Sequence, residues 1–237
     1  MKNKEELLSS QIQLVNEIYT HAREMGLSND DIEPITDGVH SIDGYLNSPT
    51  KIMWILKEPV DDVINGKPAG GGWSITDHCF GVKDNVWSQP TWQPIIYITY
   101  GYLHGLMWKD MNWIRDDKEM ANVLENIAYL NVSKMPGYSK SDWNNINEGY
   151  SIWKTILEKQ IKLYEPQVII FGGTFSHFKN DYEARGLKSI DTVQGVIDVY
   201  KIDDKILIDA YHPLQTQFDR GTYVDSIILM LKKYLPI

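Results

Sequence analysis

The stretch Val-Ile-Ile-Phe-Gly-Gly at positions 168–173 indicates the fold more directly than any other part of the chain. It is an uninterrupted apolar run that follows Pro166 and ends in a pair of glycines, a pattern typical of a strand buried on both faces. Two further runs have the same character, KIMWIL at 51–56 and IAYLNV at 127–132. Because strands of this kind are covered on both sides, the three runs predict a parallel sheet packed between helices.

Segments with apolar residues at helical spacing separate these strands. The clearest covers 143–164, where Ile146, Trp153 and Leu157 recur at helical spacing and the pattern stops before Pro166. Helices are also predicted over 3–25, 93–108, 117–126, 174–184 with Thr174 as the cap, and 222–234, and two strands joined at Asp203 and Asp204 are predicted over 196–211.

Strands that alternate with helices long enough for crossover connections predict an α/β fold. We expect a three-layer α/β/α architecture around a central, mostly parallel, four-stranded sheet. The chain is predicted to form a single domain over 1–237, with an N-terminal helical extension at about 1–45. Residues 60–92 show little periodicity, so they are predicted to form a long loop with a functional role.

The composition is that of a globular protein with a core of ordinary size. Of the 237 residues, 43% are hydrophobic, and a single cysteine, Cys79, excludes a disulfide framework and any metal site built from several thiolates. No stretch approaches the roughly 18 apolar residues of a membrane span, and the first residues, MKNKEELLSSQ, lack the apolar run of a signal peptide. We therefore expect a cytoplasmic protein without a membrane partner.

The charge balance is acidic. There are 23 lysines and arginines against 32 acidic residues, a net charge of −9, and the arginines are scattered along the chain. Such a chain repels phosphate backbones at long range. This counts against strong non-specific binding to DNA.

The ends of the predicted strands select the candidate functional residues, because ligands of parallel α/β sheets bind beyond the carboxyl ends of the strands. The candidates are Lys57, Glu58 and Pro59 after the first strand, Asn131 at the end of the second, Gly172 and Gly173 after the third, and His212 and Pro213 after the last. Each strand end has a structural alternative. In it Glu58 is a solvated acid, Asn131 forms a turn, the glycine pair makes a tight turn, and His212 is a surface histidine. The predicted topology nevertheless brings all four strand ends to one rim.

The order of KIMWILKEPV, YLNVSKMPG, EPQVIIFGGTF and LIDAYHP resembles the uracil-DNA glycosylase superfamily over roughly 50–214. In that family the first strand ends in a short turn of the G-Q-D-P, G-E-A-P or G-M-N-P type, and Glu58 takes the position before the proline. Asn131 matches the asparagine of the family's N-V-x-K pattern, and His212 matches its late His-Pro pair.

The resemblance also implies roles for aromatic residues. The segment Cys79-Phe80-Gly81-Val82 is similar to the family segment whose phenylalanine stacks on the target base, and Trp73 is the alternative for that role. Two departures concern the first turn, where Lys57 replaces a common glutamine or glutamate and Val60 replaces a tyrosine that in some members excludes thymine.

The activity implied by the resemblance is excision of a uracil-type base, as in DNA repair. Glu58 would stabilise the cationic sugar and orient water, and a neutral His212 would donate to the departing base. Asn131 would read the edge of the base. The implied partner is DNA, preferably single-stranded, or a free base or nucleoside, and the implied reaction needs no cofactor or metal.

Two other interpretations remain open at this level. The altered first turn and the acidic balance favour a non-catalytic member of the same fold that binds a base, a nucleoside or a protein partner. A metal-dependent hydrolase is the second, although its possible ligands lack any recognised spacing. Those ligands are Asp61, Asp62, Asp77, His78 and His212.

Overall fold

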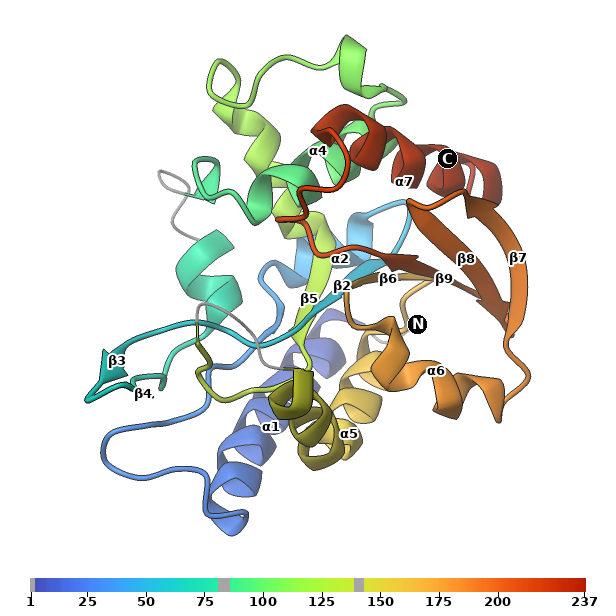
Figure 1. Ribbon diagram of the computed structural model, residues 1–237. Helices are drawn as coiled ribbons and strands as arrows, with labels where there is room; N and C mark the ends of the chain where they lie inside the picture. The colour runs from blue at the N-terminus through green and yellow to red at the C-terminus, as the bar shows by residue number, and fades with distance from the viewer. Residues whose placement is uncertain (1–2, 81–85, 139–142) are drawn as a thin grey trace.

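Among residues 3–80, 86–138 and 143–237, which the computed structural model describes, seven strands form one central sheet (Figure 1). Their order is β1-β5-β2-β6-β9-β8-β7. Strands β5, β2, β6 and β9 are parallel to one another, whereas β1, β8 and β7 pair antiparallel with their neighbours. The strands are β1 (Gly38–Val39), β2 (Ile52–Leu56), β5 (Ile127–Asn131), β6 (Val168–Gly172), β7 (Lys188–Val193), β8 (Ile197–Ile202) and β9 (Lys205–Ala210).

The α/β class and the parallel centre of the sheet are confirmed, but the expectation of a four-stranded sheet is wrong. The four parallel strands are the apolar runs that the sequence marks. Strands β2, β5 and β6 are buried throughout, and β9 is buried at four of its six residues. The additional strands carry weaker signals. Strand β1 has only two residues, and β7 is a partly exposed edge strand rich in polar residues. Strands β8 and β9 form the pair predicted over 196–211, and they extend the sheet as an antiparallel hairpin.

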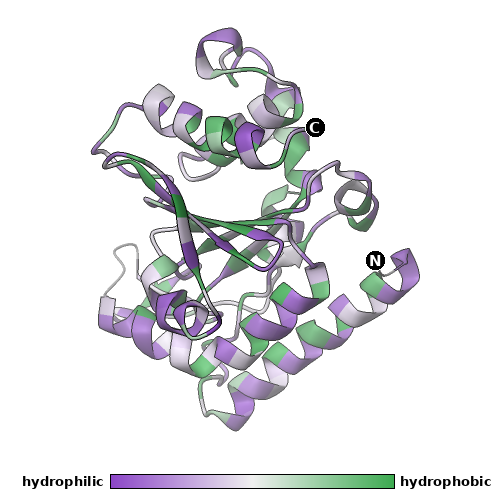
Figure 2. Cartoon of the chain, turned by 90° about the vertical axis from the view of Figure 1, so that its right-hand side faces the viewer, coloured by the Kyte–Doolittle hydropathy of each residue, from purple (hydrophilic) through white to green (hydrophobic). Residues whose placement is uncertain are grey.

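Side chains of the parallel strands alternate between two hydrophobic cores, one on each face of the sheet. Trp54 lies in the first core and Met53 in the second. The first core is covered by α4 (Trp92–Leu103), α7 (Arg220–Tyr234) and the 3-10 helix η3 (Lys118–Asn126), and the second by α1 (Lys4–Glu24), α2 (Ile42–Asn47), α5 (Trp143–Tyr164) and α6 (Phe175–Glu183). Figure 2 shows the helices on either side of the sheet with hydrophilic residues on their outward surfaces.

Several helix boundaries differ from the sequence prediction. The helix expected over 93–108 ends at Leu103, and Gly105 follows with a φ of 72°, which stops the helical path. The helix expected over 117–126 is a 3-10 helix. Thr174 does not cap α6 with its side chain, because its hydroxyl donates to the carbonyl of Ile55 at 2.8 Å. The helix at 143–164 is confirmed.

The segment predicted as a long loop holds short elements of its own. A hairpin of β3 (Val63–Ile64) and β4 (Lys67–Pro68) projects from the body of the molecule, and a π-helix, η1 (Thr76–Phe80), follows (Figure 1). Between them the chain passes through three glycines with positive φ. A Cβ on Gly71 would lie 1.8 Å from the carbonyl oxygen of Glu33, so only glycine allows this close approach. The glycine turn leads directly into Trp73.

The remaining short helix, η2 (Trp108–Asp110), precedes η3. Within the part of the chain that the structure describes, none of the helices combines the length and the apolar character needed to span a bilayer.

Candidate functional site

The four parallel strands end level with one another at a single edge of the sheet. Their register places Leu56 opposite Asn131 and Gly172 opposite Ala210. Backbone hydrogen bonds continue beyond this point, from the amide of Val132 to the carbonyl of Leu56 at 2.8 Å and from the amide of Gly173 to the carbonyl of Ala210 at 2.7 Å. The segments that follow the strands therefore meet at this edge.

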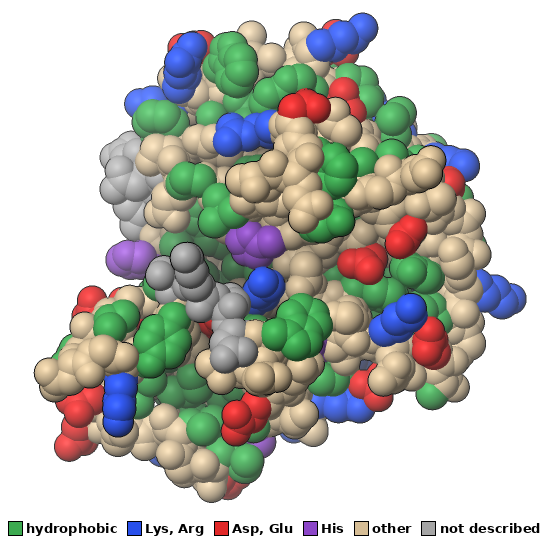
Figure 3. Space-filling view, viewed as in Figure 1, with side chains coloured by type: hydrophobic (Ala, Val, Ile, Leu, Met, Phe, Trp, Pro, Cys, Tyr) green, Lys and Arg blue, Asp and Glu red, His purple; other side chains and the backbone are tan. Residues whose placement is uncertain are grey.

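A cavity of about 660 Å³ opens there, which we call the strand-end cavity. Its volume falls within the range of roughly 300–1,000 Å³ that is usual for small-molecule sites. Figure 3 shows a hollow on this face around which hydrophobic and uncharged side chains predominate. The sequence-predicted residues that line the strand-end cavity are Lys57, Glu58, Pro59, Trp73, Gly173 and His212, and those that do not are Phe80, Asn131, Gly172 and Pro213.

His212 follows β9 and presents a neutral imidazole to the strand-end cavity. Burial, together with the positive charge of Lys57, lowers the pKa of His212 to about 4. The ring Nδ1 accepts a hydrogen bond from the backbone amide of Leu214 at 3.2 Å. Because Nδ1 is the acceptor, the single proton of the neutral ring lies on Nε2. His212 is thus a hydrogen-bond donor and not a cation at neutral pH.

Lys57 approaches His212 across Gly173, the second glycine of the strand-end pair. Gly173 has a φ of 72°, and a Cβ placed on it would lie 3.8 Å from Cε of Lys57 and 3.7 Å from Cβ of His212. The structure gives the Lys57 ammonium no hydrogen bond or ion pair with any residue that it describes. Gly172 has a packing role, because a Cβ there would meet Leu56 Cδ2 at 2.1 Å.

Glu58 lines the strand-end cavity from the segment that follows β2. Its side chain packs against Gly137, where a Cβ would lie 2.2 Å from Cγ of Glu58. The amide of Gly137 donates to the carbonyl of Pro59 at 2.8 Å, which ties the two segments together. Glu58 is therefore a half-buried residue of the cavity wall whose side chain packs on the neighbouring Gly137 segment.

Aromatic side chains form another part of the wall, although not all the expected ones take part. Trp92 and Tyr129 line the cavity, with ring centroids 4.8 Å apart. Both side chains are 3% exposed, and Phe80, which is 4% exposed, packs in edge contact with both rings. Trp73 lines the cavity and donates from Nε1 to Asp61 at 2.7 Å. Gly81 and Val82, which belong to the segment expected to carry the stacking residue, lie outside the described residues.

Asn131 lies behind this aromatic wall. It is fully buried, and its Oδ1 accepts a hydrogen bond from the hydroxyl of Tyr129 at 3.0 Å. Burial raises the pKa of Tyr129 well above its ordinary value, so this hydroxyl remains a donor. The Nδ2 group of Asn131 has no hydrogen-bond partner among the described residues. Tyr129 thus connects the amide of Asn131 to the strand-end cavity.

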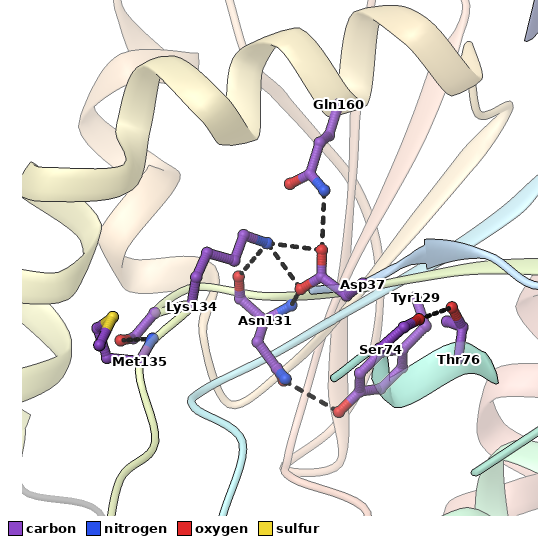
Figure 4. Close-up of polar contacts among 9 residues, drawn as sticks. Asp37, Ser74, Thr76, Tyr129, Asn131, Lys134, Met135 and Gln160 are labelled. Carbon is purple, nitrogen blue, oxygen red and sulfur yellow. Dashed lines mark hydrogen bonds and ion pairs between the residues drawn. The ribbon is translucent and has the colours of Figure 1, made fainter. Parts of the chain in front are cut away.

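A buried ion pair holds Asn131 in place (Figure 4). Lys134 donates from Nζ to both carboxylate oxygens of Asp37, at 2.8 and 2.7 Å, and to the carbonyl of Asn131 at 2.8 Å. Asp37 also accepts a hydrogen bond from the backbone amide of Asn131 at 2.7 Å and one from the side-chain amide of Gln160 at 2.8 Å. Lys134 and Asp37 have side chains that are 0% exposed. Burial lowers the pKa of Lys134, and the charge of Asp37 opposes that shift.

Sequence reasoning missed several of these residues. Tyr129 sits inside an apolar run, so nothing in the pattern separates it from a core residue, and Trp92, between Thr91 and Gln93, has no pattern around it that marks a cavity residue. Asp37 lies in a polar stretch without periodicity. The polar residues that follow the His-Pro pair offered a usable signal, because polar residues directly after a strand-end candidate belong to the same rim. They are Gln215, Thr216 and Gln217, all of which line the cavity.

Two of the possible metal ligands, Asp61 and Asp77, are engaged by neighbouring residues. Asp61 accepts from the amide of Gly71 and from Trp73, both at 2.7 Å, and Asp77 pairs with His40 at 3.3 Å. Within the described residues, no group of three or more His, Cys, Asp or Glu side chains is arranged to hold a metal ion. Cys79 lines the cavity, but burial raises the pKa of its thiol to about 11, so it is not a thiolate at neutral pH.

Comparison with known proteins identifies no relatives, since neither any protein-family description nor any curated protein matches the chain.

The neutral state of His212 is directly testable by heteronuclear NMR. We expect its imidazole to titrate near pH 4 and to carry its proton on Nε2 above that pH. The Lys57→Gln variant removes one of the two causes of the shift, so the pKa of His212 should rise while remaining below the ordinary value of about 6.5. Lys67→Gln, which removes an exposed charge on the β3–β4 hairpin, should leave the titration unchanged. A wild-type His212 that titrates near 6.5 would contradict this assignment.

The buried ion pair predicts a large loss of stability when one partner is removed. Lys134→Met leaves the carboxylate of Asp37 buried without its countercharge, so the free energy of unfolding should fall by about 3–5 kcal/mol in urea titrations. The matched control is Lys159→Met, which breaks the exposed pair with Glu17 at 2.7 Å and should cost no more than about 1 kcal/mol. Equal, small losses in both variants would show that the buried pair does not stabilise this edge of the sheet.

Proposed function

We propose that this chain is a hydrolase of the uracil-DNA glycosylase type, which cleaves the N-glycosidic bond of a uracil-type base in flipped or single-stranded form. The observation that carries the proposal is the presence of the neutral Nε2–H donor of His212 and the carboxyl group of Glu58 in the wall of one cavity. The order of the strand-end motifs, which resembles that superfamily, supports it.

The chemistry needs these two groups. As the bond between the sugar and the base breaks, positive charge develops on the sugar and negative charge on the base. Glu58 stabilises the cationic sugar and orients the water that attacks it. His212 donates from Nε2 to the base oxygen on which negative charge collects. A neutral histidine can do this throughout the physiological pH range, because its pKa of about 4 lies below that range.

The cavity wall also suits a flat heterocycle. Trp73, which lines the cavity and is partly exposed, offers aromatic surface on which a base can stack, and stacking of this kind is worth about 1–3 kcal/mol per base. Asn131 acts together with Tyr129, since the tyrosine hydroxyl connects the buried amide to the cavity. In this assignment Phe80, which is 4% exposed, packs with Trp92 and Tyr129, each 3% exposed, and does not stack on the base itself.

The charge of the site favours a substrate that presents few phosphate groups to the protein. Among the described residues, Lys57 is the only lysine or arginine that lines the strand-end cavity, and the chain carries a net charge of −9. With few phosphate contacts, binding to single-stranded DNA is weak and strengthens as salt is lowered.

A second candidate function is favoured by the position of Asn131. Its amide is buried behind Tyr129 instead of being open to the cavity, which suits a protein that binds a base or nucleoside without cleaving it. This non-catalytic alternative uses the same aromatic wall and the same donors.

Excision of uracil tests the proposal. Purified protein incubated with a uracil-containing single-stranded oligonucleotide at low ionic strength should generate abasic sites, which alkali converts to strand breaks. Glu58→Gln removes the charge but keeps the shape, so the rate should fall by at least about 100-fold while base binding persists. Asn131→Ala should weaken recognition of the base.

Asp62→Asn provides the matched control, because Asp62 is an exposed acid of the same segment that does not line the cavity, and it should retain the wild-type rate. An absence of abasic sites after prolonged incubation with stoichiometric protein, combined with tight binding of free uracil, would replace the hydrolase by the non-catalytic alternative.

A further inference from the structure

Lys57 brings a primary amine to the strand-end cavity, and no described residue holds that amine in a structural contact. It is the only lysine or arginine in the described chain that lines the cavity. Lysines at neighbouring strand ends differ from it. Lys51, which precedes β2, donates to two backbone carbonyls, and Lys134, which follows β5, is bound to Asp37. Those two side chains tie the backbone together, whereas Lys57 is left for a group that enters the cavity.

Neutral imidazoles surround this amine. Cε of Lys57 and Cβ of His212 lie 3.8 and 3.7 Å from the position that a Cβ on Gly173 would occupy, so both side chains pass over the same glycine. The pKa of His177, in α6, is lowered by burial and by the charge of Lys57. Nδ1 of His177 donates to Asn147 at 2.7 Å, so its Nε2 carries a lone pair, to which no described residue donates. A proton acceptor therefore lies close to Lys57.

An accessible lysine amine with a proton acceptor nearby is the usual arrangement for covalent catalysis on a carbonyl group. Lysine suits this task because its ammonium can lose a proton to become a nucleophile, which an arginine cannot do. The cavity thus offers the parts of an amine nucleophile: the amine of Lys57, the lone pair of His177 and the carboxyl group of Glu58 in the same wall.

The site of the proposed excision supplies a carbonyl group within reach of Lys57. The base oxygen that faces His212 belongs to a carbon bonded to the same ring nitrogen as the sugar carbon C1′, so a side chain beside His212 is also near C1′. Departure of the base vacates the space between them, and the ring-opened abasic sugar carries an aldehyde at C1′. We propose that Lys57 forms an imine with the aldehyde of an abasic deoxyribose and so gives the chain a second activity, cleavage of the DNA strand at that sugar.

The reaction runs without an added oxidant or reductant. The amine of Lys57, having given one proton to His177 or to solvent, attacks C1′, and the aldehyde oxygen leaves as water to give a protonated imine. Glu58 removes a proton from C2′, and the electron pair of that C–H bond expels the 3′ phosphate with the electron pair of its C–O bond. Water then hydrolyses the imine, which releases an unsaturated aldehyde and restores Lys57. The inference rests on the proposed function only in that base excision delivers the abasic sugar.

Trapping of the imine tests the inference. A single-stranded oligonucleotide with a preformed abasic site is incubated with the protein and sodium borohydride, which reduces the imine to a stable amine. Wild-type protein should become cross-linked to the DNA, with the added mass on the peptide that contains Lys57. Without borohydride the strand should break at the abasic site in the absence of alkali.

Matched variants separate a nucleophile from a positive charge. Lys57→Gln and Lys57→Arg should each lower cross-linking and strand cleavage by at least about 100-fold, because arginine keeps the charge but forms no imine. Lys67→Gln, which removes an exposed lysine from the β3–β4 hairpin, should behave as wild type. Melting temperatures verify that each variant is folded.

The outcomes are independent of uracil excision, because the abasic site is supplied in advance. Cross-linking at Lys57 supports the inference even where a uracil-containing strand is left intact, in which case the proposed hydrolase fails and the amine site stands. An absence of cross-linking, a cross-link on another lysine, or one that persists in Lys57→Arg would overturn the inference, whatever the result with uracil.

Discussion

The register of the four parallel strands is the constraint on which the candidate site depends. Hydrogen bonds between β2 and its neighbours place Leu56 beside Asn131, and those between β6 and β9 place Gly172 beside Ala210. A parallel ladder has no freedom to offset one strand without breaking its bonds or turning its buried side chains to the other face. Residues that are far apart in the sequence, Lys57, Gly173 and His212, therefore meet at one edge because the strands before them are aligned.

Two local features convert this aligned edge into a cavity with defined chemistry. The glycines at the end of β6 leave space, since side chains at Gly172 or Gly173 would collide with Leu56 or crowd Lys57 and His212. The buried pair of Asp37 and Lys134 fixes the end of β5, because Asp37 accepts from the backbone amide of Asn131 and Lys134 donates to its backbone carbonyl. Burial is costly for both charges, and several hydrogen bonds offset that cost. The edge is thus buried and hydrogen-bonded at Asn131, whereas His212 lines the cavity.

Much of the fold follows from the sequence, because buried parallel strands and amphipathic helices leave strong patterns. The strand at 168–172 and the helix at 143–164 are examples. The edge strands cannot be predicted from the sequence in this way, because β7 is polar and partly exposed and β1 has only two residues. The strand-end rule brings Glu58 and His212 to one cavity, whereas it has no means of placing Asn131 behind Tyr129. That detail depends on how side chains pack, and packing is not encoded in periodicity. The charge of Lys57 acquires meaning only once its closeness to His212 is known.

The central claim is that the strand-end cavity binds a planar base against the aromatic wall, with its oxygen turned toward His212. A crystal structure of the protein soaked with uracil tests this most directly. The account predicts a ring stacked on Trp73, with one of its oxygens within about 3.2 Å of Nε2 of His212. A ring bound elsewhere, or bound in the cavity with its oxygens turned away from His212, would contradict the account.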